Sequence, residues 1–167
     1  MSRFVPFDSL RSVEPNYFVY QTPLGRVSIQ AREQCITRIE LGPVELEGRY
    51  ASSSVTNQAA TQIQEYLAGK RSSFDLQLAP EGSEFQLLVW QQLCKIPYGQ
   101  TMSYGDVARE IGRPKAFRAV GMAANRNRIL LAIPCHRVIG ADGGLVGFAC
   151  GLHVKRFLLD LESKAAL

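Results

Sequence analysis

A cysteine beside a histidine and an arginine is the group in this chain best suited to covalent chemistry. Cys135, His136 and Arg137 stand in the run Ile-Pro-Cys-His-Arg-Val-Ile-Gly, an apolar segment that ends at Gly140. Neighbouring cationic or proton-accepting groups lower the pKa of a thiol, and the thiolate is the nucleophilic form. The sequence therefore predicts a reactive thiol at Cys135. A lone cysteine in an apolar run is also typical of an inert core residue.

A basic stretch leads up to this cysteine. Residues 1–80 hold eight Lys/Arg and eight Asp/Glu, whereas residues 81–167 hold eleven and seven, so the net charge of +4 arises in the second half. Such a stretch is either a solvated face or the footprint of phosphate binding. Between residues 109 and 137 only Glu110 opposes Arg109, Arg113, Lys115, Arg118, Arg126, Arg128 and Arg137.

Composition narrows the class of protein. A chain of 167 residues with 46% hydrophobic content can bury the core of one domain or of two small ones. Its four cysteines have no C-x-x-C spacing and only two histidines could assist them, which argues against a zinc site. No signal-peptide core is visible, and no run approaches the roughly 20 apolar residues of a membrane span. We therefore expect a soluble, cytoplasmic protein with free thiols in a reducing compartment.

The first half of the chain has the pattern of a small sheet with one helix. Alternating apolar residues predict strands, the first two of which are joined by a turn at Thr22-Pro23-Leu24-Gly25. A helical pattern stops at Gly69, and a linker follows the last strand. Residues 1–80 are thus predicted to form an N-terminal α/β domain with strands at 17–21, 26–30, 35–41 and 74–78, a helix at 57–68 and a linker at 79–82.

The second half, residues 81–167, is predicted to be a mostly helical C-terminal domain. Ser83 and Ser103 each begin a capping-box pattern, so helices should start there and run through about residues 93 and 112. A third helix is expected at 115–124, joined to the second by Gly112-Arg113-Pro114. Two short helices around such a turn suggest a helix-turn-helix, whose commonest use is DNA binding. Short helix pairs also occur in proteins that bind nothing.

The third of these helices is rich in small residues. Arg118 is the one charged side chain between residues 116 and 124. A surface of this kind can approach a nucleic-acid groove closely and insert a side chain into it. It can equally pack tightly against a neighbouring helix, and the sequence leaves both interpretations open.

Together these motifs resemble the O6-alkylguanine-DNA alkyltransferases, which repair alkylated guanine directly. The resemblance rests on Pro134-Cys135-His136-Arg137-Val138, the helix start at Ser103-Tyr104, the Arg118 helix and the turn at Asn127. It continues upstream through Thr22-Pro23-Leu24-Gly25, Tyr66-Leu67-Ala68-Gly69 and residues 85–90, and so covers nearly the whole chain.

The resemblance implies a chemistry. A methyl or other alkyl group on guanine O6 in duplex DNA would move irreversibly to Cys135, with His136 as a base acting through a water and Glu162 orienting the histidine. This relay follows the logic of the catalytic triads. A thioether has no polarised carbonyl for water to attack, so the protein would act once, and it would need no cofactor. The implied substrates leave O4-alkylthymine open.

The family pattern also implies how DNA is bound. Reaching O6 requires the nucleotide to be extruded from the duplex. Arg118 would fill the vacated space from the minor groove, and Tyr104 would press on a phosphate or donate to guanine N3; alternatively, Arg118 faces a phosphate and Tyr104 packs the helix start. The implied partner is double-stranded DNA, bound by a monomer, with cooperativity left open. Further DNA contacts are expected from Ser103, Ala123, Arg126 and Arg128.

Several residues depart from that pattern around the expected substrate pocket. Arg126 and Arg128 flank Asn127 where glycine and proline are common, and they could strengthen DNA binding electrostatically. Cys150 stands at a position that is usually glycine, so it could distort the backbone or narrow the pocket against bulky alkyl groups. Asn127 is expected to brace the turn. The expected pocket comprises Asn127, Val138, Phe148 in place of a frequent tyrosine, Ala149 and Cys150.

Three other classes of protein fit parts of the sequence. A lesion sensor of the same family would lack the reactive cysteine, and Cys135 argues against it. A cysteine hydrolase needs its thiol and histidine to meet from distant segments, whereas neighbours on an extended segment point to opposite faces. A transcription factor would ordinarily dimerise, and no zipper is visible in the sequence.

Overall fold

The computed structural model describes residues 1–165 and divides the chain into two compact units. The N-terminal unit comprises Met1–Glu81 together with Arg128–Ala132, and the C-terminal unit comprises Gly82–Asn127 and the residues from Ile133 onward. The chain thus returns to its first unit for five residues. The sequence did not predict this return.

A six-stranded sheet forms the N-terminal unit, with the strand order β1-β6-β4-β3-β2-β5. Its centre is the antiparallel meander predicted from the alternating pattern, in which Thr22 pairs with Gly25 across a tight turn. Gly25 has φ 93°, a conformation that favours glycine. The strands are β1 (Arg3–Phe4), β2 (Asn16–Thr22), β3 (Gly25–Arg32), β4 (Cys35–Leu41), β5 (Arg49–Tyr50) and β6 (Gln77–Leu78), and a short 3-10 helix covers Phe7–Leu10.

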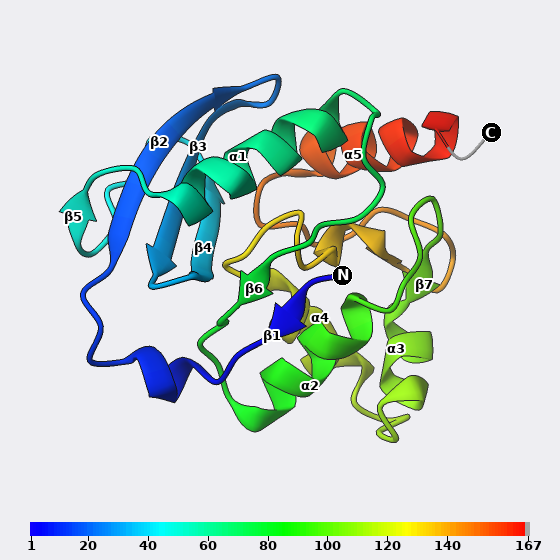
Figure 1. The fold of residues 1–167 in the computed structure, drawn as a ribbon. Helices are drawn as coiled ribbons and strands as arrows, with labels where there is room; N and C mark the ends of the chain where they lie inside the picture. Colours follow the sequence, from blue (N-terminus) through cyan, green and yellow to red (C-terminus); the bar gives the residue numbers. More distant parts are fainter. Residues whose placement is uncertain (166–167) are drawn as a thin grey trace. The chain divides into compact units, whose positions relative to one another are not determined.

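One helix, α1 (Ser54–Leu67), lies along this sheet (Figure 1). It begins three residues before the predicted start, because Ser53 and Thr56 form a capping box in which threonine replaces the usual glutamate or glutamine. Its buried stripe includes Ala59, Ile63 and Tyr66. The predicted strand at 74–78 was wrong in extent: Phe74 and Leu76 are buried as loop residues, and only β6 pairs with neighbours.

The returning segment 128–132 extends the N-terminal sheet beside β4. Ile39 N donates to Arg128 O at 2.9 Å, and Leu130 N donates to Ile39 O at 3.1 Å. Ile129 and Leu131 are buried, and Leu131 has φ 68°, which is rare for a leucine. Four residues after this strained position the chain reaches Cys135.

The C-terminal unit is mostly helical, as predicted. Capping boxes at Ser83 with Gln86 and at Ser103 with Asp106 begin the helices that the sequence placed there. The third predicted helix starts at Phe117 rather than at 115, because the preceding residues form a turn. The helices are α2 (Glu84–Leu93), α3 (Tyr104–Glu110), α4 (Phe117–Asn125) and α5 (Leu152–Ala165), and α3 and α4 form the helix-turn-helix pair.

A two-stranded parallel sheet connects the start of α3 to the segment after the cysteine. Strand β7 (Met102–Ser103) pairs with β8 (Val138–Ile139). Met102 pairs with Val138, the residue after Cys-His-Arg, and Ser103 pairs with Ile139. The pairing therefore fixes the start of α3 at Tyr104 beside the end of the Cys-His-Arg segment. Across residues 1–165, every helix falls short of the length and apolar character that spanning a bilayer requires.

Trp90 anchors α4 to α2. Its side chain is 2% exposed, and Nε1 donates to the carbonyl of Ala123 at 2.8 Å. That carbonyl lies in the last turn of α4 and also accepts from Arg126 N at 3.1 Å, so the indole adds a second hydrogen bond that ties the end of α4 to α2.

Replacing Trp90 with phenylalanine should therefore lower the free energy of unfolding by about 0.5–1.5 kcal/mol through loss of this hydrogen bond, and further through the smaller buried side chain. The measurement is urea denaturation followed by circular dichroism. Leu88→Ala, on the exposed face of the same helix, is the control and should change stability by no more than about 0.5 kcal/mol. Equal effects of the two variants would contradict the anchoring role of Trp90.

Candidate active site

The Cys-His-Arg segment is a short 3-10 helix, Cys135–Arg137, that follows Pro134. Cys135 N donates to Ile133 O at 2.8 Å and Arg137 N donates to Pro134 O at 3.0 Å, so the turn is held by its own backbone. Cys135 is 5% exposed and His136 1%. The expectation of an extended segment with neighbours on opposite faces was wrong, since three residues per turn separate successive side chains by a third of a rotation.

A buried carboxylate orients this turn. Glu162, on α5, is 1% exposed, and its Oε1 lies 2.7 Å from His136 Nε2. Its Oε2 accepts from Gly99 N at 3.1 Å and from Arg137 Nε at 3.0 Å. The structure thus brings together the histidine and the glutamate that the sequence proposed as a relay.

Arg137 completes this group and was missed as a site residue. It is 8% exposed, its Nη2 donates to Glu162 Oε1 at 2.9 Å, and its Nη1 donates to Ile96 O at 2.7 Å. The guanidinium also lies 5.7 Å from the ring centroid of Tyr98. Arg137 therefore belongs to the interior and not to a phosphate-binding surface, which corrects its place in the basic stretch.

Asn127 braces the cysteine directly. Its Nδ2 donates to Ile133 O at 2.9 Å and to Cys135 Sγ at 3.2 Å, and the side chain is 5% exposed. A donor to sulfur favours the thiolate over the thiol. Asn127 therefore holds the position of the thiol and also acts on its charge.

Burial dominates the protonation of the thiol. It raises the pKa of Cys135 to about 11, and the hydrogen bond from Asn127 and the charge of Lys155 oppose the shift without cancelling it. The expectation that its neighbours would hold this pKa down was wrong, because the adjacent histidine and arginine point toward Glu162. Cys135 is a thiol at neutral pH and needs a base to become a nucleophile.

Lys155 is a second residue that the sequence analysis missed. It is fully buried on α5, its Nζ donates to the carbonyls of Val138 and Val146, and it lies near enough to Cys135 to lower the pKa of the thiol. Burial lowers its own pKa. A signal was present in the sequence: Lys155, Leu158 and Glu162 follow helical spacing, so two charged residues share the apolar stripe of α5.

The loop between β8 and α5 supplies three of the expected pocket residues, and Val138 lies in β8 itself. Tyr104 donates from its hydroxyl to Val146 O at 2.9 Å, and Lys155 Nζ lies 5.9 Å from the ring centroids of both Tyr104 and Phe148. Phe148 and Cys150 are half-buried and Ala149 is exposed, whereas Val138 is fully buried.

Cys150 has an ordinary backbone. Among residues 1–165 the non-glycine residues with positive φ are Glu33 and Leu131, so Cys150 does not distort the loop. Its thiol is close enough to raise the pKa of Cys135. Of the two effects expected from its side chain, narrowing of the pocket remains.

The residues expected to contact DNA do not share one surface. Arg118 is exposed on α4, Arg126 is exposed as the C-cap residue of α4, and Ser103 caps α3. Ala123 is 2% exposed and faces the interior with its carbonyl on Trp90. Arg128 lies in the N-terminal unit, where it lines a pocket of about 340 Å³ together with Glu45, Glu47 and Glu81.

His136 is neutral at neutral pH. Burial lowers its pKa below the usual 6.5, and the hydrogen bond and charge of Glu162 oppose that shift in part. With Nε2 bonded to Glu162, Nδ1 is the nitrogen that can accept a proton. Within residues 1–165, His, Cys, Asp and Glu side chains nowhere gather in a group of three or more that could hold a metal ion.

Two family matches cover most of the chain. Residues 16–80 match the family described as 6-O-methylguanine DNA methyltransferase, ribonuclease-like domain. Residues 84–164 match the DNA-binding domain of the same enzyme. The chain belongs to the 6-O-methylguanine DNA methyltransferase family. The resemblance seen in the sequence is thereby confirmed, and DNA is a partner of this protein.

The sequences of individual relatives align with this chain over nearly their full length. Proteins named methylated-DNA--protein-cysteine methyltransferase are 44% identical in Methanosarcina barkeri and 45% identical in Methanosarcina acetivorans, each over 151 residues. The matches cover 87% of this chain and 96% and 97% of those proteins. A crystal structure of Mycobacterium tuberculosis OGT in complex with DNA is 38% identical, with a TM-score of 0.84, and the match covers 90% of this chain and 94% of that one.

The imidazole of His136 should titrate with a midpoint below 6.5, because burial disfavours the charged ring more than Glu162 favours it. Nitrogen-15 NMR of the side chain measures this midpoint, and His153→Gln removes the other imidazole and so assigns the signals. The unfolded chain binds this proton first, so the group destabilises the native state as pH falls below 6.5. A midpoint at or above 6.5 would contradict the burial of a neutral ring.

Proposed function

We propose that this protein repairs DNA by direct reversal, moving an alkyl group from O6 of guanine in a duplex to Cys135 and acting once. The observation that carries the proposal is the buried chain of contacts from Asn127 through Cys135 and His136 to Glu162. A structural cysteine has no need of a neighbouring histidine held by a carboxylate. A nucleophilic one does.

The proposed reaction begins with the thiol proton. Glu162 accepts from His136 Nε2, which leaves Nδ1 as the base, and the proton of Cys135 passes to it through a bridging water. Lys155 and the amide of Asn127 stabilise the thiolate that forms. Sulfur then attacks the alkyl carbon, and a C–S bond replaces the C–O bond. The released electron pair stays on the guanine, which takes up the proton that Cys135 gave to His136.

The product explains why turnover stops. Acyl groups on sulfur hydrolyse because water can add to their carbonyl, but a thioether offers no such carbon. Each molecule would therefore be consumed by one lesion. The substrate supplies the group and the thiolate accepts it, so the reaction as proposed uses no cofactor.

The helix-turn-helix is proposed to hold the duplex from the minor groove while the lesion nucleotide is extruded. Arg118 is exposed on α4 and can fill the vacated space. Tyr104 would exchange its bond to Val146 O for a phosphate or guanine N3. The proposal places a monomeric protein in the cytoplasm, where thiols stay reduced.

The first experiment weighs the intact protein after mixing it with a duplex that carries one O6-methylguanine. We expect one added methyl per molecule, located on Cys135 after digestion, with the DNA restored to guanine and no second turnover. Cys135→Ser is the control and should gain no methyl. If the duplex binds while neither mass changes, the protein is a lesion sensor and the proposal fails.

Cys150 should limit the size of the transferred group, since its side chain is close to the thiol on an unstrained loop. Cys150→Gly is expected to raise the rate with O6-benzylguanine relative to O6-methylguanine by about tenfold, within the range that one group in a pocket commonly provides. Rates come from single-turnover mixing with each duplex. An unchanged ratio of the two rates would show that Cys150 points away from the alkyl group.

A further inference from the structure

The exposed face of α4 carries two apolar side chains among its charges. Phe117 is 48% exposed and Met122 is 60% exposed, on a helix whose other apolar residues are small or buried. Phe117 is the first residue of the helix. An exposed phenylalanine on an otherwise small-residue surface has an unfavourable contact with water, so a partner that covers it gains free energy.

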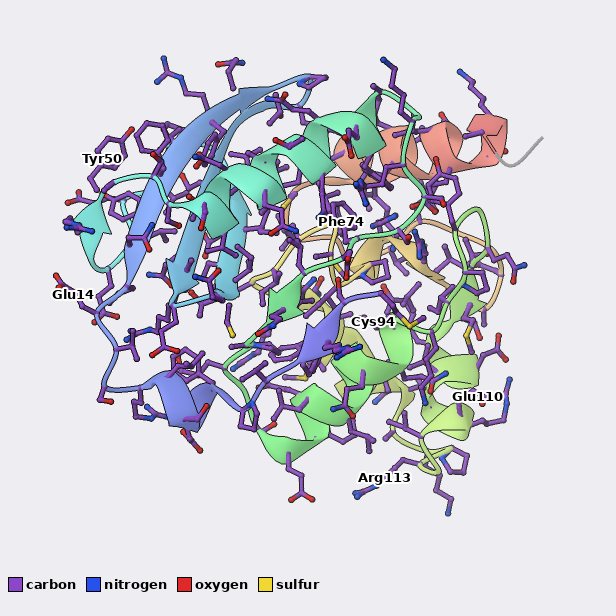
Figure 2. All side chains as sticks on the ribbon, viewed as in Figure 1. Glu14, Tyr50, Phe74, Cys94, Glu110 and Arg113 are labelled. Atoms are coloured by element: carbon purple, nitrogen blue, oxygen red, sulfur yellow. The ribbon has the colours of Figure 1, made fainter. Side chains whose placement is uncertain are left out.

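Charge identifies the partner. Arg113 and Lys115, in the turn before α4, are exposed. Arg118 on the helix and Arg126 at its C-cap are exposed as well. Glu110 is the one exposed carboxylate of the α3 end, and Figure 2 labels it with Arg113 around the turn between α3 and α4. Cations around an aromatic side chain are the combination that binds phosphates and bases together.

Phe117 also contacts Arg118, the residue proposed to fill the space of the extruded nucleotide. The guanidinium carbon of Arg118 lies 5.7 Å from the centroid of the Phe117 ring, within the range of a cation–π contact. The two planar groups therefore stand together at the amino end of α4.

We propose that Phe117 is a second positioning residue for DNA, whose ring wedges into the base step beside the extruded nucleotide and stacks there. This inference rests on the proposed function, because it takes Arg118 to occupy the space of the lesion base. Apolar wedges in the minor groove unstack a step and hold the duplex bent. Phe117 would thus hold apart the base pairs between which Arg118 occupies the space of the extruded nucleotide.

The test measures affinity for a duplex with O6-methylguanine in a Cys135→Ser background, which holds the lesion without consuming it. Phe117→Ala should weaken binding by about 5- to 150-fold, the range that corresponds to loss of one base–aromatic stack. Phe117→Tyr should restore it. Phe157→Ala, an exposed phenylalanine on α5 at 41%, is the matched control and should bind as its parent does.

Salt dependence separates a wedge from a charge effect. Phe117→Ala should leave the slope of log affinity against log salt unchanged, because a ring neutralises no phosphate. Arg126→Ala should reduce that slope by about one. A smaller slope for Phe117→Ala would mean that the substitution removes a contact to a phosphate, and the inference would fail.

Reaction with free O6-methylguanine base tests whether the thiol is intact. In a protein with Cys135 present, Phe117→Ala should react with the free base at the rate of the wild type; a slower reaction would place its effect on the thiol site and overturn the inference. If the wild type gains no methyl from the duplex, the proposed function fails. If it does gain one while Phe117→Ala binds the duplex as its parent does, this inference alone fails.

Discussion

The C-terminal unit depends on one buried carboxylate. Glu162 receives hydrogen bonds from the backbone at Gly99, from His136 and from Arg137, and thereby joins α5 to the loop after α2 and to the Cys-His-Arg turn. A charge in an apolar interior is destabilising unless it is paired and hydrogen-bonded. Arg137 supplies the opposite charge, so the histidine can remain neutral. The same interaction that satisfies a structural requirement fixes which ring nitrogen is available as a base.

A second constraint is the protonation of the thiol. Burial keeps Cys135 protonated at neutral pH, while Asn127 and Lys155 favour its ionised form. A thiol in this balance resists small oxidants and alkylating agents, because only the thiolate reacts readily. Ionisation then waits for a base and a substrate held in place. In the proposed single-use reaction, this restraint would keep the thiol unreacted until the lesion is bound.

Much of this arrangement was predictable from the sequence. The alternating pattern gave β2, β3 and β4, and the serine capping boxes gave the starts of α2 and α3, because both signals are local. Arg137 and Lys155 were missed because their charge suggests a surface, and only long-range packing shows that their partners are buried. The return of residues 128–132 to the first unit is likewise a long-range pairing, made through Ile39, that no local pattern carries. The exposure of Phe117 could not be predicted either, because an aromatic residue at a helix start is usually expected to be buried.

That return also bears on how such a protein can be rearranged. Domains that follow one another along a chain can be exchanged, duplicated or expressed apart with a single cut in the coding sequence. Here a cut after Glu81 would leave the first unit without the strand-like segment beside β4, and it would leave Ile129, Leu130 and Leu131 without the sheet that buries them. A single cut between the two units is therefore expected to leave the first with an incomplete sheet and the second with an exposed apolar segment.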